Sequence, residues 1–192
     1  MDLDQRKEYF NEEILEVSET EKHFEELEFE DCVFKKCNFI TCIFTRCKFV
    51  GCRFENCVLS AVSFNNSRLI DVSFKNSKVI GIDWGKADLL RSINFIDSTL
   101  NYSSFRMLKL PKIKMENCEA KEVEFIESDL SLGSFQGTDF TKAIFSKTNL
   151  NGANFTEAKN YYIDVTNNKV RKAHFSLPEA LNLLSSFEVI IE

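Results

Sequence analysis

A large apolar residue returns at every fifth position over most of this chain. The series runs from Phe24 to Leu89 and, after one inserted residue, from Phe95 to Phe155. Of its 27 members, only Ala120 lacks a large side chain. A period of five fits neither an α-helix nor a β-strand. It suits a chain of short extended segments that turns a corner every five residues, so we expect a solenoid whose coils stack.

A second inward position lies two residues before each large centre, and at most repeats it holds a small residue: Cys, Val, Ser, Thr, Ala or Gly. The other three positions of each pentapeptide are mostly polar, as at Lys35-Lys36 and Asn65-Asn66, and we expect them to face solvent. All seven cysteines fall in the small column: Cys32, Cys37, Cys42, Cys47, Cys52, Cys57 and Cys118.

The regular cysteine spacing has three interpretations: a metal site, a disulfide ladder, or core packing. Zinc ligands are usually two to four residues apart, often with histidine, whereas these are five apart and only His23 and His174 exist. If residues twenty apart stack, Cys32 lies over Cys52 at about 4.8 Å, within disulfide range. The side chains would point inward in parallel, however. We therefore expect structural thiols, which pack as small hydrophobes, and no metal or cofactor.

The segment TDFTKAIFSKTNLNGANFTEA, residues 138–158, resembles the A-(D/N)-L-x-x pattern of the pentapeptide-repeat family. The resemblance covers about residues 22–157. It implies an all-β fold, a right-handed quadrilateral parallel β-helix with four pentapeptides per coil and about seven coils. We expect one register break near residues 90–92, with Leu90, Arg91 and Ser92 as candidates for the extra residue.

Both ends of an open solenoid need covers, because unpaired strand edges are a liability. Residues 1–21 show no repeat and are expected to form an N-terminal cap, in which Phe10, Ile14, Leu15 and Val17 cover the first coil. Residues 158–192 are expected to form a C-terminal cap.

The C-terminal cap is expected to hold a short α-helix and then an extended tail. Ser176 and Glu179 match a capping box, and Pro178 suits the first turn. A helix that only covered the last coil would not need as many apolar residues as this one has, at Leu181, Leu183 and Leu184. In the quinolone-resistance members of the family a similar helix joins two rods tail to tail, so the resemblance implies a homodimer through this helix.

The least regular part of the repeat follows the break. It holds Pro111 and several basic residues, and we select Arg91, Arg106 and Lys109 as a candidate partner-contact region. The plainer interpretations are a one-residue bulge at the break and a solvated basic face beyond it.

Charge is divided unevenly along the chain. Residues 1–31 hold 13 acidic and 3 basic residues, whereas residues 32–192 hold 17 acidic and 21 basic residues. The repeats are therefore not acidic. With a sequence pI near 5.2 and no surface pattern of aromatic and basic residues, direct nucleic-acid binding is not expected. No apolar run approaches a membrane span and no leader is seen, so we expect a cytoplasmic protein with no membrane partner.

The inward positions offer no convergent polar groups and no catalytic motif is present, so we do not expect an enzyme. Quinolone-resistance members, and relatives that give immunity to topoisomerase-poisoning toxins, bind DNA gyrase or topoisomerase IV as acidic rods resembling duplex DNA. The resemblance implies such a topoisomerase partner and a role in antibiotic resistance. The repeats depart from a simple DNA mimic because they lack an acidic stripe. The alternative is a general protein–protein interaction scaffold.

Overall fold

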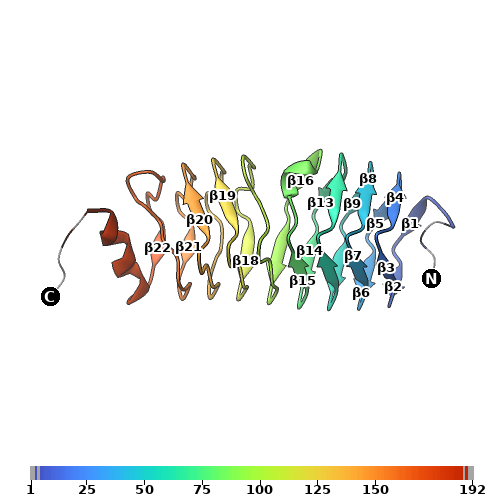
Figure 1. Cartoon of the computed structure of the whole chain (residues 1–192), viewed down its shortest axis with the longest axis horizontal. Coiled ribbons are helices and arrows are strands. Elements are labelled where there is room, and N and C mark those ends of the chain that lie inside the picture. Colours follow the sequence, from blue (N-terminus) through green and yellow to red (C-terminus); the bar gives the residue numbers. More distant parts are fainter. Residues whose placement is uncertain (1–2, 4, 188, 190–192) are drawn as a thin grey trace.

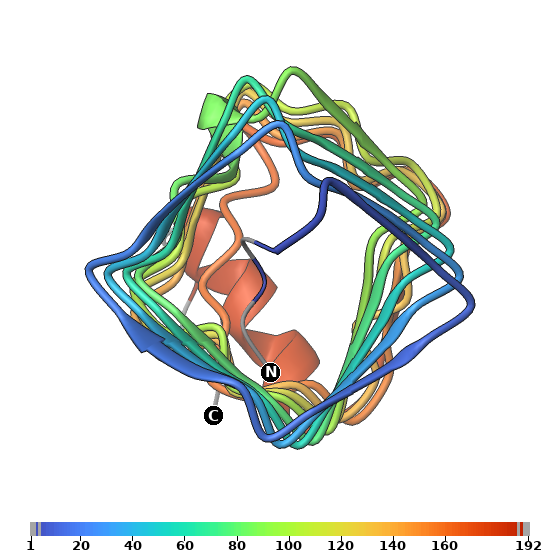
Figure 2. The same cartoon turned by 90° about the vertical axis from the view of Figure 1, so that its right-hand side faces the viewer.

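The chain winds into a rod of stacked coils. The computed structural model describes residue 3, residues 5–187 and residue 189. Over this part the rod makes about eight turns, from the N-terminal coils to a short C-terminal helix (Figure 1). Seen along its axis, the coils superimpose as a four-sided frame (Figure 2). The predicted parallel β-helix is confirmed, and at about 4.8 Å per coil the rod is roughly 38 Å long.

Each side of the frame is a parallel sheet, and we call the four sides faces A to D. Face A consists of β1 (Glu8–Phe10), β5 (Glu28–Glu30), β9 (Lys48–Val50), β13 (Arg68–Ile70) and β16 (Leu89–Arg91). Face B consists of β2 (Glu13–Leu15), β6 (Val33–Lys35), β10 (Arg53–Glu55), β14 (Ser73–Lys75), β17 (Asn94–Ile96) and β18 (Lys114–Glu116). Face C consists of β3 (Ser18–Thr20), β7 (Asn38–Ile40), β11 (Val58–Ser60) and β15 (Lys78–Ile80). Face D consists of β4 (His23–Glu25), β8 (Ile43–Thr45) and β12 (Ser63–Asn65).

Later coils continue these faces with shorter pairings. On face D these are β19 (Glu124–Ile126) and β20 (Ile144–Ser146), and on face B they are β21 (Asn154–Phe155) and β22 (His174–Phe175). Two 3-10 helices complete the described secondary structure: η1 (Trp84–Lys86) and η2 (Glu179–Phe187). Among the described residues, no helix is long and apolar enough to cross a membrane.

The large central residues fill the interior as ring stacks that run along the rod. On face B, Phe54 stacks between Phe34 and Phe74, with ring centroids 4.4 and 4.9 Å away and planes within 16° of parallel. On face D, Trp84 stacks between Phe64 and Phe105 at 5.6 and 5.8 Å. The predicted central column is therefore the core, since burial of each large apolar side chain contributes roughly 1.5–3 kcal/mol.

The small inward column does more than fill space. Its polar members donate to the carbonyl of a central residue in the preceding coil: Cys57 Sγ lies 3.3 Å from Phe34 O, and Ser67 Oγ lies 2.9 Å from Phe44 O. Ser67 Oγ also accepts from the backbone N–H of Cys47. The column thus prefers small groups, and where it is polar those groups link one coil to the next.

Most corners of the frame are residues in the left-handed backbone region; the corner at η1 is an exception, since Ala87 there is extended with φ −73°. The corner lies two residues after the central position, as at Lys36 with φ +52° and Arg46 with φ +53°. Only a few corners are glycine, among them Gly51 and Gly81. This conformation costs a non-glycine residue about 1–2 kcal/mol, so the coil-to-coil contacts must offset strain at each such corner.

The solenoid begins earlier than predicted. Instead of the predicted N-terminal cap over residues 1–21, β1 to β3 pair with β5 to β7 at a separation of twenty residues. Tyr9 and Ile14 are buried centres, and the sequence pattern failed at the next centre because it holds the polar residue Glu19. Phe10 and Leu15, expected to cover the first coil, are about half exposed. The buried Leu3 lies at this end, where its carbonyl accepts from the Tyr9 hydroxyl at 2.9 Å.

The solenoid also ends later than residue 157. Phe175 stacks on Phe155 with ring centroids 5.3 Å apart, and β22 pairs with β21. The backbone around the buried Tyr161 and Ile163 is irregular, so this last coil does not show the five-residue apolar period in the sequence. With both ends extended, the rod has about eight turns instead of seven.

The C-terminal helix is of the 3-10 type instead of the predicted α type. Ser176 does not close the predicted capping box, because its Oγ accepts from the backbone N–H of Glu157 in the last coil. Glu179 instead accepts from the side-chain amide of Asn182. The extended tail predicted after the helix lies largely outside the described residues.

The register break lies before Leu90. Phe64 and Trp84, twenty residues apart, are stacked, whereas Leu69 pairs with Leu90, twenty-one residues away. The extra residue is therefore taken up between Trp84 and Leu90, where η1 replaces a strand. The predicted position at Leu90, Arg91 or Ser92 is wrong, and Leu90 is the central residue of its repeat in place of Leu89.

Candidate protein-binding site

The backbone ladder of the rod is interrupted beyond β16, along face A and its two bordering corners. No backbone hydrogen bond among the described residues joins residues 85–92 to residues 106–112 of the next coil. The sheet of face A accordingly ends at β16. On both sides of the interruption the coils remain bonded, for example through Trp84 N to Ser104 O at 3.1 Å and through the pairing of β17 with β18. Two coils are thus parted locally along face A, in the sense that no backbone hydrogen bond between their described residues joins them there.

Two features of the sequence account for this opening. The extra residue turns the chain through η1, where Asp83 accepts from Gly85 N at 3.0 Å, and this displaces the corner that follows. Pro111 stands in the facing coil, and proline has no backbone N–H to donate to β16. The backbone hydrogen bonds missing between these two coils are therefore explained by the local sequence of each coil.

The parted coils leave a shallow groove of about 600 Å³. Its lining residues come from η1 and from the next two coils: Asp83, Gly85, Lys86, Ser104, Arg106, Met107, Leu108 and Glu124. Arg106 Nη1 lies 3.6 Å from a Glu124 carboxylate oxygen. Met107 is 70% exposed at the corner. The groove therefore offers both signs of charge beside an exposed apolar side chain, which suits contact with a protein surface.

The three residues predicted to contact a partner lie around this opening. Arg91 ends β16 on one side of it, and Arg106 and Lys109 belong to the coil on the other side. All three are exposed. Arg91 and Lys109 lie on face A, whereas Arg106 precedes the corner on face D and lines the groove. Whether they touch a partner stays a prediction.

Ion pairs bind the acidic first coils to basic residues one coil further on. Lys35 Nζ lies 2.5 Å from Glu13, Lys48 Nζ lies 3.4 Å from Glu28, and Arg46 reaches both Glu25 and Glu26. These groups are substantially exposed, so each pair contributes about 0–1 kcal/mol. Their main effect is on charge, because they balance much of the acidity predicted for the N-terminal end.

The seven thiols are free and buried, as a structural role requires. Burial raises the pKa of Cys47 to about 11 and the pKa values of Cys52 and Cys118 to about 12. The thiolate is the nucleophile and the metal ligand, so these three side chains stay protonated and unreactive near neutral pH. No group of three His, Cys, Asp or Glu side chains suited to a metal ion occurs among the described residues.

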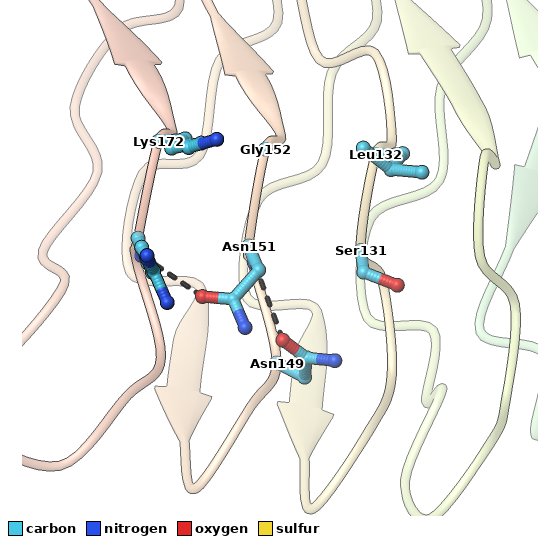
Figure 3. Close-up of a pocket in the computed structure, with 7 residues that line it drawn as sticks. Ser131, Leu132, Asn149, Asn151, Gly152 and Lys172 are labelled. Atoms are coloured by element: carbon cyan, nitrogen blue, oxygen red, sulfur yellow. Dashed lines mark hydrogen bonds between the residues drawn. The ribbon is translucent and has the colours of Figure 1, made fainter.

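A second shallow groove, of about 550 Å³, lies near the C-terminal end of face A. Figure 3 shows Leu132, Gly152 and Lys172 in one row on three successive coils, beside Ser131, Asn149 and Asn151. Asn151 Oδ1 accepts from Arg171 N at 2.9 Å. Gly152 contributes no side chain to this row, and that leaves a shallow hollow with a polar, basic edge.

The predicted dimer helix divides into an inner and an outer side. Leu183 is partly buried and packs against the core, as a cap requires. Leu181 and Leu184 are 44% and 38% exposed, and Phe187 is 55% exposed. The helix thus covers the last coil and also presents an apolar surface, although the dimer itself stays a prediction.

Sequence reasoning missed two features of the structure, one in the core and one at this site. It treated the small column as space-filling, although Ser and Thr in that column were a signal that hydrogen bonds are made there. It also missed the interrupted ladder, for which Pro111 opposite a strand was the available signal.

Comparisons with known proteins agree with the fold. A family model described as "Pentapeptide repeat region" matches residues 23–105, and one described as "Pentapeptide repeats (8 copies)" matches residues 121–157. No curated protein matches the chain by sequence. Among solved structures, a trypsin-treated variant of QnrB1, a plasmid-mediated fluoroquinolone resistance protein, superimposes with a TM-score of 0.72 and 15% identity, covering 94% of this chain and 100% of the QnrB1 chain.

A second trypsin-treated variant of QnrB1 gives a TM-score of 0.70 with 16% identity, covering 96% of this chain and 98% of that one. HetL, a pentapeptide repeat protein involved in heterocyst differentiation regulation from the cyanobacterium Nostoc sp. Strain PCC 7120, gives a TM-score of 0.46 with 10% identity, covering 89% and 88%. At these identities the QnrB1 variants establish the likeness of fold alone.

Proposed function

Because this chain belongs to the pentapeptide-repeat family, we propose that it is a protein-binding rod without catalytic activity, and that its partner is a type II topoisomerase. In this role it protects DNA gyrase or topoisomerase IV from quinolones or from a gyrase-poisoning toxin. The observation that carries the proposal is the likeness to QnrB1 over nearly the whole of both chains. It is supported by the exposed, chemically mixed groove at the parted coils.

The charges of the rod bear on how such binding would work. Acidic residues are concentrated in the first coils and are partly paired with bases. We therefore propose contact through local patches instead of imitation of DNA along the whole rod. Arg91, Arg106 and Lys109 around the parted coils are the proposed contact region.

A supercoiling assay with purified gyrase, with and without ciprofloxacin, tests this function. We expect the protein to restore supercoiling in the presence of the drug, or to inhibit gyrase at micromolar concentration. A folded protein with no effect in either arm would remove the topoisomerase proposal. The general interaction scaffold would then be the better account. It is favoured independently by the near balance of charge over most of the rod, which imposes no single kind of partner.

We also propose that two copies associate through the outer side of η2. Replacing both Leu181 and Leu184 with Glu should convert a dimer into a monomer, because charges would be buried at an apolar contact. Size-exclusion chromatography with light scattering measures the change. Ile144→Glu is the control, since Ile144 is 46% exposed elsewhere on the rod. A wild-type protein that is monomeric at micromolar concentration would contradict the dimer.

A further inference from the structure

One side of the rod collects the basic residues of the repeats. The surface concerned is face A with its two bordering corners, over the four coils between residues 46 and 112, and we call it the basic band. Its acidic residues are Asp71 and Asp88. Its basic residues are Arg46, Lys48, Arg68, Lys86, Arg91, Lys109 and Lys112. The band therefore has more than three bases for each acid.

The opposite side of the rod differs. On face C with its two bordering corners, the same four coils carry Lys78 and Lys121 against Asp97, Glu119 and Glu122. Two bases against three acids give a net charge of −1 there. The excess of bases on face A is consequently a property of one side of the rod and not of the repeat as such.

About half of the bases in the basic band form no ion pair with a described acidic side chain. Arg46 and Lys48 pair with acidic residues of the preceding coil, and Arg68 pairs with Asp88 at 2.9 Å. The other four bases make no ion pair with any described residue, although Lys109 lies beside Asp129 of the next coil and helps to lower the pKa of that carboxyl; they are Lys86, Arg91, Lys109 and Lys112. These four lie on the two sides of the parted coils, so the bases of the band that form no ion pair within the described chain are gathered at the opening.

Apolar side chains alternate with the bases in the same band. Val50 lies beside Ile70 in the parallel register, and Leu89 lies beside Arg68. Leu89 is 37% exposed, and Met107 at the corner is 70% exposed. Each coil thus places a base and an apolar group side by side on the surface.

We infer that the basic band docks an acidic segment of a partner protein that also carries apolar side chains. The unpaired bases supply charge complementarity to carboxylates, which speeds and orients association. The apolar residues favour a protein over a nucleic acid, because a phosphate backbone gives them nothing to contact.

The inference rests on the proposed role as a protein-binding rod but not on gyrase being the partner. Loss of the supercoiling effect would leave it standing, and loss of acidic-segment binding would leave a gyrase effect to be explained by another surface. The two proposals are therefore separable by experiment.

The probe is a fluorescein-labelled peptide of about eight alternating Glu and Leu residues, which spans the band when extended at about 3.3 Å per residue. Anisotropy is measured at about 0.1 M salt, where distant charges are screened. The test variant is Arg91→Glu with Lys109→Glu. The matched control is Lys75→Glu with Lys78→Glu, two exposed lysines at the corner between faces B and C that also lack ion pairs with described residues. Circular dichroism checks that both variants are folded.

We expect the test variant to weaken peptide binding by about tenfold and the control variant by less than about twofold. A peptide in which Ser replaces Leu should bind more weakly than the Glu-Leu peptide. Equal binding by the two variants, no saturable binding by the wild type, or equal binding of the Ser peptide would overturn the inference. So would a DNA duplex that displaces the peptide and is weakened by the same variant, which would identify a nucleic-acid surface.

Discussion

Replacing Phe54 with Ala is expected to lower the free energy of unfolding by about 3–5 kcal/mol. Phe54 is 2% exposed, and its ring is sandwiched between Phe34 and Phe74 in the face B stack. The change removes the ring from both neighbours and leaves a cavity that a hydrogen-bonded frame cannot close. Because each coil contacts mainly its neighbours, the defect weakens the coupling on both sides.

Denaturant melts followed by circular dichroism measure this effect. Tyr102→Ala is the control, because Tyr102 is 62% exposed at a corner and its removal should cost less than about 0.5 kcal/mol. A loss below about 1 kcal/mol for Phe54→Ala would show that the ring stack is not what holds the coils together.

Gly133→Val is expected to destabilise the protein by about 1–3 kcal/mol through overpacking. Valine occupies the same small column at Val62 and Val123, so the sequence pattern alone allows it. At Gly133, however, a Cβ atom would lie 2.9 Å from Leu130 O and 2.9 Å from Cε2 of Phe135. A carbonyl of the backbone and a buried ring cannot both move aside without disturbing the coil.

The matched control is Gly85→Ala, where the nearest atom to an added Cβ is Asp83 Oδ1 at 3.2 Å, the end of a flexible side chain. Thermal or denaturant melts of the two variants should differ clearly. Equal stability would mean that the small column adapts locally, and that Gly133 was not selected for close packing.

Much of the fold followed from the five-residue period, because burial dictates that period. The central positions such as Phe54 and the small column such as Cys57 are inward as expected. The ends were misjudged where a polar centre, Glu19, or irregular backbone around Tyr161 broke the apolar series. The left-handed corners could not be recognised from glycines in the sequence, because residues such as Lys36 and Arg46 occupy most of them.

The site was harder to predict than the fold. Leu89 and Leu90 are both apolar, so periodicity could not decide which of them faces the interior, and the register break was misplaced as a result. Arg91, Arg106 and Lys109 were chosen because they flank an irregular stretch, and the structure places them around one opening. Whether these three residues lie close together depends on how the coils stack. That could be derived from the sequence only if the number of residues in the coil that contains η1 were known.

The interrupted ladder weakens the coupling between two neighbouring coils along one side of the rod, while backbone bonds such as Gly81 N to Asn101 O at 2.9 Å join the same region of the rod on the other sides. In a linear array of repeats, stability is a sum of terms within each coil and between neighbouring coils. At this junction the backbone contribution is missing between residues 85–92 and 106–112, while ring contacts continue, with Trp84 and Phe105 stacked at 5.8 Å. Directional bonds resist bending strongly, whereas packed rings slide more easily. On this side the junction is therefore held by packing of side chains instead of by the backbone ladder, and a partner that bridges it would supply contacts that the ladder lacks there.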